Sequence, residues 1–251
     1  MDSTLFLKSE MRNGKTYLKD VYYTAPYKIM SPFQRDHGIE VMMMCASAGL
    51  LGGDSFYMDL EIGENSDVLF TTQSYEKIFD SGNGVTKKNL EVTINPGGRL
   101  IYLPYPSIPF GGSNFYNISK VNLSVNSRCI YSDILSCGRV GMGERFQMKN
   151  LDSVCRVYVG GELVFAEHTR LEPDCVPYDA LGLWQGYSHT GMLYVYGAER
   201  ENEWIEKVRR MELPKGIFGI TRCRKGVLLR ALGKSGEQIY EFFYRVALLC
   251  T

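Results

Sequence analysis

Acidic side chains in apolar or glycine-rich surroundings are the residues of this sequence best suited to chemistry. The candidates are Asp54, Glu76, Asp80, Asp133, Glu144 and Glu167. An ionised carboxylate is rarely buried alone, so each is expected to pair with Lys or Arg, to cap backbone amides, or to face an interior wet enough to pass a cation. Divalent cations accept carboxylate, imidazole and water ligands. The residues alone therefore leave local ion pairs and transient cation handling both open.

The three histidines, His37, His168 and His189, offer little for metal-dependent hydrolysis. None lies in an H-x-x-x-H or H-E-x-x-H arrangement, which would bring two imidazoles to one face of a helix. His168 follows Glu167 in a strand-like stretch, where its imidazole could be a structural hydrogen-bonding group or a general base. A small hydrolase that uses His168 with Glu167 is therefore an alternative function.

Motifs for covalent catalysis and nucleotide binding are incomplete. The serines with glycine neighbours, Ser47, Ser113 and Ser235, lack the G-x-S-x-G spacing of a nucleophile elbow. The segment Gly233-Lys-Ser235 resembles the end of a phosphate-binding loop, but Gly226 is too far upstream for the spacing that this loop requires. Ser235 is instead expected to cap a helix.

Charge and composition exclude several classes of protein. The 28 basic residues balance 28 acidic ones, so no overall field draws the chain to nucleic acid or to an anionic membrane. No apolar run is long and unbroken enough to span a bilayer, and the first residues lack an export signal. The seven cysteines have no C-x-x-C spacing, which favours reduced, mostly buried thiols in the cytoplasm.

Period-two alternation of apolar and polar residues dominates the first two thirds of the chain and predicts half-buried strands. It is clearest in residues 56–62, 90–94 and 121–125. Residues 41–46 do not alternate and are expected to form a strand buried on both faces. Glycine-rich turns separate the strands at short intervals, so we expect a mainly β protein, a sandwich, barrel or β-solenoid-like scaffold, with one domain over residues 1–251.

Helical periodicity appears only near the C-terminus, where it predicts two helices. The apolar face of the first consists of Trp204, Ile205, Val208 and Met211. The second is predicted to begin at Ser235, with Gln238 completing a capping box. Its apolar face consists of Ile239, Phe242, Phe243, Val246 and Leu249.

A series of short segments resembles, in sequence and order, those of a known family. They are Ser47-Ala-Gly-Leu-Leu-Gly-Gly-Asp54, Thr71-Thr-Gln-Ser-Tyr-Glu-Lys-Ile78, Leu103-Pro-Tyr-Pro-Ser-Ile-Pro-Phe110, Tyr131-Ser-Asp-Ile134, Cys137-Gly-Arg139, Gly143-Glu-Arg-Phe146 and Leu163-Val-Phe-Ala-Glu-His-Thr-Arg-Leu171. In this order they resemble the UreD/UreH family of urease accessory proteins, over residues 20–250. Ala48 departs from the proline that is frequent in the family, which affects turn stiffness.

The resemblance implies a non-catalytic, largely β-stranded scaffold that helps to load nickel into urease. It implies that the helical accessory protein UreF binds the chain and recruits the GTPase UreG, and that the assembly docks on apo-urease. Whether the complex is symmetric and contains two copies of the chain is left open.

The resemblance further implies that nickel passes through an interior water-filled channel, with no tightly bound cofactor. The acidic positions of the family match Asp54, Glu76, Asp133 and Glu167, and these form a predicted nickel relay to which we add Glu144. A purely structural adaptor is the alternative to a conduit.

Overall fold

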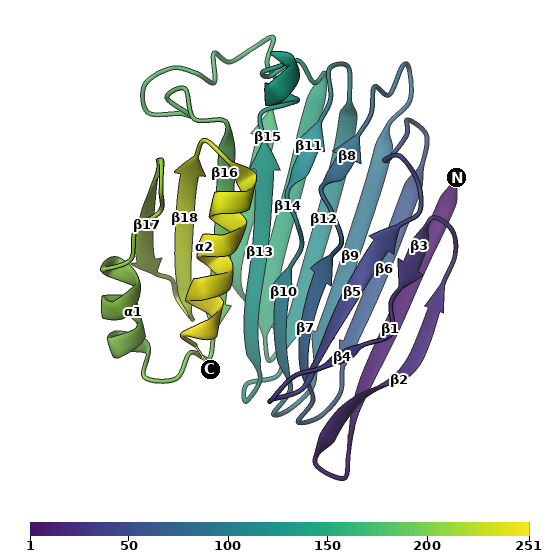
Figure 1. Ribbon diagram of the computed structural model, residues 1–251, viewed down its shortest axis with the longest axis vertical. Helices are drawn as coiled ribbons and strands as arrows, with labels where there is room; N and C mark the ends of the chain where they lie inside the picture. Colours follow the sequence, from purple (N-terminus) through teal and green to yellow (C-terminus); the bar gives the residue numbers. More distant parts are fainter. Residues whose placement is uncertain (251) are drawn as a thin grey trace.

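Two β-sheets packed face to face form the body of the protein in the computed structural model, which describes residues 1–250 (Figure 1). The smaller sheet contains, in spatial order, β15 (Glu162–Leu171), β14 (Asn150–Val159), β12 (Asn114–Leu123), β9 (Thr86–Ile94), β6 (Ser55–Ile62), β1 (Asp2–Arg12) and β2 (Lys15–Tyr23). The larger sheet contains β17 (Gly216–Arg222), β18 (Val227–Gly233), β16 (His189–Tyr196), β13 (Arg128–Ser136), β10 (Arg99–Leu103), β7 (Asp67–Thr72), β5 (Ile39–Cys45) and β3 (Tyr27–Ile29). The short strands β4 (Phe33–Gln34), β8 (Glu76–Ile78) and β11 (Ser107–Pro109) join the larger sheet beside this path.

The middle of the chain coils between the two sheets, so that each coil stacks on the one before it. Strands β6, β9, β12 and β14 pair in parallel in one sheet, and β7, β10 and β13 pair in parallel in the other. This arrangement confirms the predicted β-solenoid-like scaffold. The coils differ in length, because Leu100 pairs with Val68 on one side and with Cys129 on the other. A repeat of fixed length is therefore not visible in the sequence.

The predicted alternation agrees with the observed strands, with two corrections. Residues 56–62 and 90–94 lie in β6 and β9 with their apolar side chains buried between the sheets. Val125 is 66% exposed, because β12 ends at Leu123 and the backbone turns at Ser127. In β5, Val41 and Met43 are buried but the opposite face is only half-buried, so the prediction of burial on both faces was wrong.

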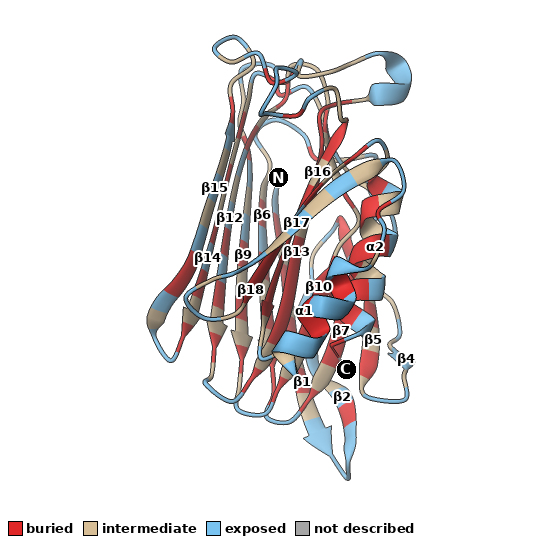
Figure 2. Cartoon of the chain, turned by 90° about the vertical axis from the view of Figure 1, so that its left-hand side faces the viewer, coloured by how far each residue is buried: buried red, intermediate tan, exposed pale blue. Residues whose placement is uncertain are grey.

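Two helices cover the outer face of the larger sheet and create a second apolar core (Figure 2). They are α1 (Glu201–Arg209) and α2 (Gly236–Leu248), and a short 3₁₀ turn, η1 (Val140–Met142), lies elsewhere on a loop. The Ser235 hydroxyl accepts a hydrogen bond from the Gln238 amide at 3.4 Å, which confirms the predicted cap. The Gln238 side-chain oxygen has no partner among the described residues, so the reciprocal bond of a capping box is not made. Leu249 follows the end of α2 and is exposed, contrary to the prediction.

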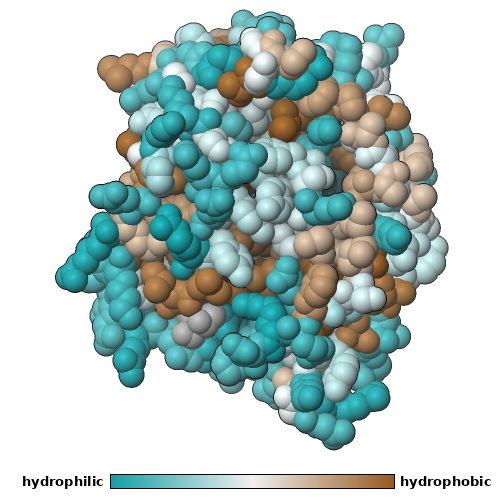
Figure 3. Space-filling model, in the orientation of Figure 1, coloured by the Kyte–Doolittle hydropathy of each residue, from teal (hydrophilic) through white to brown (hydrophobic). Residues whose placement is uncertain are grey.

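The surface on the α2 side mixes hydrophilic side chains with scattered hydrophobic patches (Figure 3). Within residues 1–250, no helix is long and apolar enough to cross a membrane. The cysteines are all free thiols. Four of them, Cys129, Cys137, Cys155 and Cys250, are buried, which agrees with the prediction of mostly buried thiols.

The α2 core predicts a large difference between neighbouring substitutions on one helix. Phe242 is fully buried and its ring lies 4.8 Å from that of Phe218, whereas Glu241 is exposed. We expect Phe242→Ala to lower the free energy of unfolding by about 3–5 kcal/mol, because it removes a buried ring and leaves a cavity. Glu241→Ala should change the stability by less than about 0.5 kcal/mol. Urea unfolding followed by circular dichroism measures both, and equal effects would contradict the assignment of this core.

Candidate functional site

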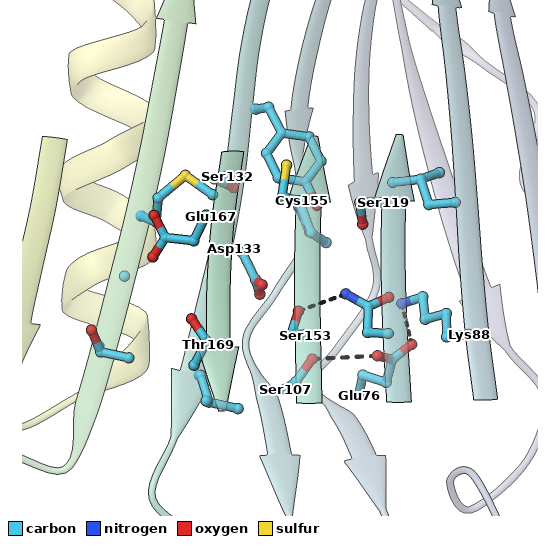
Figure 4. Close-up of a pocket in the computed structure, with 18 of the residues that line it drawn as sticks. Glu76, Lys88, Ser107, Ser119, Ser132, Asp133, Ser153, Cys155, Glu167 and Thr169 are labelled. Atoms are coloured by element: carbon cyan, nitrogen blue, oxygen red, sulfur yellow. Dashed lines mark hydrogen bonds and ion pairs between the residues drawn. The ribbon is translucent and has the colours of Figure 1, made fainter. Parts of the chain in front are cut away.

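A cavity of about 240 Å³ lies between the two sheets, where the inward-facing residues change from apolar to polar (Figure 4). One row of cross-strand neighbours on the inner face of the smaller sheet is Phe56, Lys88, Asn117, Ser153 and Thr169. All of these except Phe56 line the cavity. In the larger sheet, Asp133, Met192 and Arg230 are cross-strand neighbours and line it from the other side. In-register stacking therefore gathers polar groups from distant parts of the sequence.

The cavity brings together three of the five predicted relay acids, Glu76, Asp133 and Glu167. They come from β8, β13 and β15, and Asp133 lies between the other two (Figure 4). Among the described residues, no three His, Cys, Asp or Glu side chains converge closely enough to hold a metal ion together. The three acids stand in different electrostatic settings, which determine what each can do.

Glu76 is held by a buried ammonium group. Lys88 Nζ donates to Glu76 Oε1 at 2.7 Å, and the Ser107 hydroxyl donates to Glu76 Oε2 at 3.3 Å. Burial by itself lowers the pKa of Lys88, but the Glu76 carboxylate, with smaller contributions from Tyr102 and Tyr27, more than offsets this effect and the pKa is raised. Lys88 therefore stays charged inside the sandwich. A pair of this kind is expensive to break, because removal of one partner leaves an uncompensated buried charge.

Asp133 is the unpaired acid of the cavity. No described residue gives its carboxylate a hydrogen bond or an ion pair. Burial raises its pKa from 3.8 to about 6, which the nearby Lys88 partly opposes and the carboxylates of Glu76 and Glu167 reinforce. At neutral pH the carboxylate is largely ionised and its oxygens are free to accept a cation.

Glu167 closes the cavity at the edge where the two sheets meet. Arg230 on β18 holds it through a two-pronged pair, Nη1 to Oε1 at 2.6 Å and Nη2 to Oε2 at 2.5 Å. The Glu167 side chain is only 12% exposed, whereas that of Arg230 is 59% exposed. The pair therefore links the smaller sheet to the larger one, with the guanidinium group on the solvent side.

Neutral oxygen donors line the space between these acids. Asn117 Nδ2 donates to the Ser153 hydroxyl at 3.0 Å, which leaves Asn117 Oδ1 buried and without a partner among residues 1–250. Ser119 and Thr169 add hydroxyl groups to the lining (Figure 4). Carbonyl, hydroxyl and carboxylate oxygens are ligands that a divalent cation accepts. The donor set therefore suits a partly hydrated cation.

A second cavity of about 130 Å³ adjoins the first, because Met43, Thr72 and Glu76 line both. It reaches Cys45 and Ser47, whose side chains are exposed and lie 3.2 Å apart, Sγ to Oγ. Glu76 thus stands where the interior cavity meets a second one that extends toward the surface.

Two predicted relay acids, Asp54 and Glu144, lie outside the interior cavity. Asp54 pairs with the amino group of Met1 at 2.8 Å and accepts the Leu51 amide at 3.3 Å. Glu144 pairs with Arg139, Nε to Oε2 at 2.6 Å, and this bond lowers its pKa. Both acids make local pairs and caps, which was the alternative open at the level of the sequence.

His168 and Glu167 do not form a joint site. They are consecutive residues of β15, so their side chains point to opposite faces of the sheet. Glu167 faces the cavity, whereas His168 lies on the outer face with Nε2 3.0 Å from Asp152 Oδ1. The geometry contradicts a hydrolytic pair of these two residues and agrees with a structural hydrogen bond for His168.

Lys88 and Arg230 are site residues that the sequence analysis did not single out. The alternation of inward and outward residues along β9 and β18 could have identified both. Extended backward from Leu90, the period-two pattern of β9 places Lys88 on the buried face. In β18 the inward positions include Leu228 and Arg230, whereas Leu229 belongs to the core under the helices. A charged residue on an otherwise apolar strand face could have been identified as a partner for the buried acids.

The unpaired setting of Asp133 predicts a pH-dependent gain in stability for Asp133→Asn. Since the pKa is raised to about 6 in the fold, ionisation of Asp133 destabilises the native state above that pH. At about pH 7.5 the variant should be more stable than the original chain by about 3 kcal/mol, and the gain should shrink below about pH 6 and vanish below about pH 4. Urea unfolding across this range measures the gain, with Asp36→Asn as an exposed control. A gain that does not depend on pH would contradict the assignment.

Comparison with known proteins identifies relatives over the full length of the chain. The family model described as "UreD urease accessory protein" matches residues 2–251. The urease accessory protein UreD of Acetivibrio thermocellus is 34% identical over 243 residues, which cover 95% of this chain and 93% of that protein. UreH of Helicobacter hepaticus is 34% identical over 237 residues, covering 94% and 93%, and UreH of Helicobacter pylori strain J99 is 27% identical over 254 residues, covering 100% and 95%.

Proposed function

The chain belongs to the UreD family of urease accessory proteins, and from this premise we propose that it is a non-catalytic maturation factor that conveys nickel toward the active site of urease. The observation that carries the proposal is the interior cavity, with the unpaired Asp133 carboxylate between two further acids. Nickel is the cargo of this pathway and leaves with urease.

The chemistry of the cavity suits passage of a cation. A conduit must bind its cargo weakly enough to release it, and dispersed single carboxylates do so better than a closed cage. A cation between Glu76 and Glu167 would meet Asp133 on the way, together with the free Asn117 carbonyl oxygen and several hydroxyl groups. Water could fill the remaining positions around the ion, as is usual for hydrated divalent cations.

We further propose that the chain acts as a scaffold in a larger assembly. It would bind the helical accessory protein UreF, which recruits the GTPase UreG, and the assembly would dock on apo-urease. The names of the relatives support a role in urease maturation in general. We assign this work to the cytoplasm, where the free thiols of the chain would stay reduced.

The test of the proposed function is the nickel content of urease made with and without this chain. Urease purified from cells that carry all the urease genes should be loaded with nickel. Urease from the same cells without this chain should be nickel-poor and inactive. Re-expression of the chain should restore both nickel and activity. Normal nickel content after deletion would refute the maturation role.

Two acidic substitutions separate the conduit from a purely structural adaptor. We expect Asp133→Asn to reduce the nickel content of urease severalfold, because it removes the unpaired charge of the cavity. Asp54→Asn, outside the cavity, should leave nickel loading unchanged. Co-purification with the partner proteins should persist in both variants, since neither substitution alters the outer surface of a sheet. If both variants load urease with as much nickel as the original chain does, the adaptor is favoured. If neither variant loads urease, the assembly itself has been lost.

A further inference from the structure

The cavity contains two built-in cations in addition to its acids. Lys88 holds Glu76 and Arg230 holds Glu167, at 2.7 Å and 2.6 Å respectively. Asp133 is left as the one acid of the described cavity lining without such a partner. The charges of the lining therefore nearly cancel, although the space is large enough to admit a hydrated ion.

Both oxygens of each paired acid are occupied. On Glu76, one oxygen accepts from Lys88 and the other from Ser107. On Glu167, the guanidinium group of Arg230 covers both oxygens. A metal ion that approaches either carboxylate meets an internal cation already paired with it, so the two positive charges compete with the cargo.

Lys88 is fixed in place by the fold. Its side chain is 12% exposed and projects from the inner face of β9 beside Asn117, its cross-strand neighbour. An ammonium group and a divalent ion near the same carboxylate repel each other, and the effect is large where solvent screening is weak. Lys88 therefore lowers the affinity of the Glu76 end of the cavity for a cation.

Arg230 acts at the opposite end of the cavity and differs from Lys88 in its access to solvent. Its side chain is 59% exposed, so the guanidinium group has water to move into when a cation replaces it on Glu167. The acids at the two ends of the cavity are thus paired with internal cations that differ in solvent exposure. The unpaired Asp133 lies between these acids (Figure 4).

We infer that Lys88 and Arg230 are internal counter-cations that compete with the cargo for Glu76 and Glu167, so that the cavity releases a divalent cation rather than storing it. This inference rests on the proposed function, because it concerns the regulation of the same path. It assigns to two basic residues a role in setting affinity, with the acids as the groups that contact the cargo.

The test is Ni²⁺ binding by the purified full-length chain, measured by equilibrium dialysis, together with the rate of Ni²⁺ release to a chelator. Lys88→Met and Arg230→Met should each bind Ni²⁺ at least about tenfold more tightly and release it correspondingly more slowly, because each frees a carboxylate. The double variant Lys88→Met with Glu76→Gln should lose the gain, because the freed carboxylate is gone.

Matched controls come from ion pairs outside the cavity. Lys120→Met breaks an exposed pair with Glu91 on the outer sheet face, and Arg128→Met breaks a pair with Glu199 outside the cavity. Neither control should change Ni²⁺ affinity or release. A tenfold gain in the controls as well would overturn the inference, because it would reflect overall charge.

The outcomes separate this inference from the proposed function. If Asp133→Asn abolishes Ni²⁺ binding while Lys88→Met and Arg230→Met bind as the original chain does, the inference fails and the conduit stands. If Asp133→Asn has no effect on Ni²⁺ binding either, both fail. Should Lys88→Met not fold, Arg230→Met decides alone, since its side chain is largely exposed: tighter binding supports the inference and unchanged binding overturns it.

Discussion

In-register stacking of successive coils determines which side chains meet between the two sheets. Because side chains alternate between the faces of a strand, each inward position stacks on the inward position of the next coil. Aromatic rings show the result in the larger sheet, where Tyr102 stacks on Phe70 at 5.4 Å and on Tyr131 at 5.2 Å between centroids. The same rule in the smaller sheet places Lys88 beside Phe56 and Asn117. The register thus builds both the apolar core and the polar cavity within one sandwich.

Charges inside a sandwich must be compensated, and the way this is done defines the site. Lys88 neutralises Glu76, Arg230 neutralises Glu167, and Asp133 is left with a raised pKa. Complete pairing would give a closed structural network, and a cluster of free acids would trap a metal ion. The cavity lies between these two cases, because two of its three acids are paired and one is not. It explains how a chain of a urease accessory family can have acids in its interior without a closed metal-binding cage.

The elements of this fold were largely predictable from the sequence, whereas the site was predictable only in part. Period-two alternation identified the strands, and the apolar face around Phe242 identified the second helix. The errors at Val125 and Leu249 fall at element ends, where turns end the periodic pattern. Grouping the acids required the register between coils of unequal length, which no local pattern reveals. Asp54 therefore could not be separated from Asp133 before the pairing of the strands was known.

We propose that nickel reaches urease through the space between the two sheets, and a side chain that fills this space would block its passage. Ser153 lines the cavity and the next residue, Val154, lies on the other face of β14. Urease should be assembled in cells with Ser153→Phe or Val154→Phe in place of the original chain, and its nickel content per active site measured. We expect nickel-poor urease with Ser153→Phe and normal loading with Val154→Phe, both with partner binding intact. Normal loading with Ser153→Phe would contradict passage through the cavity.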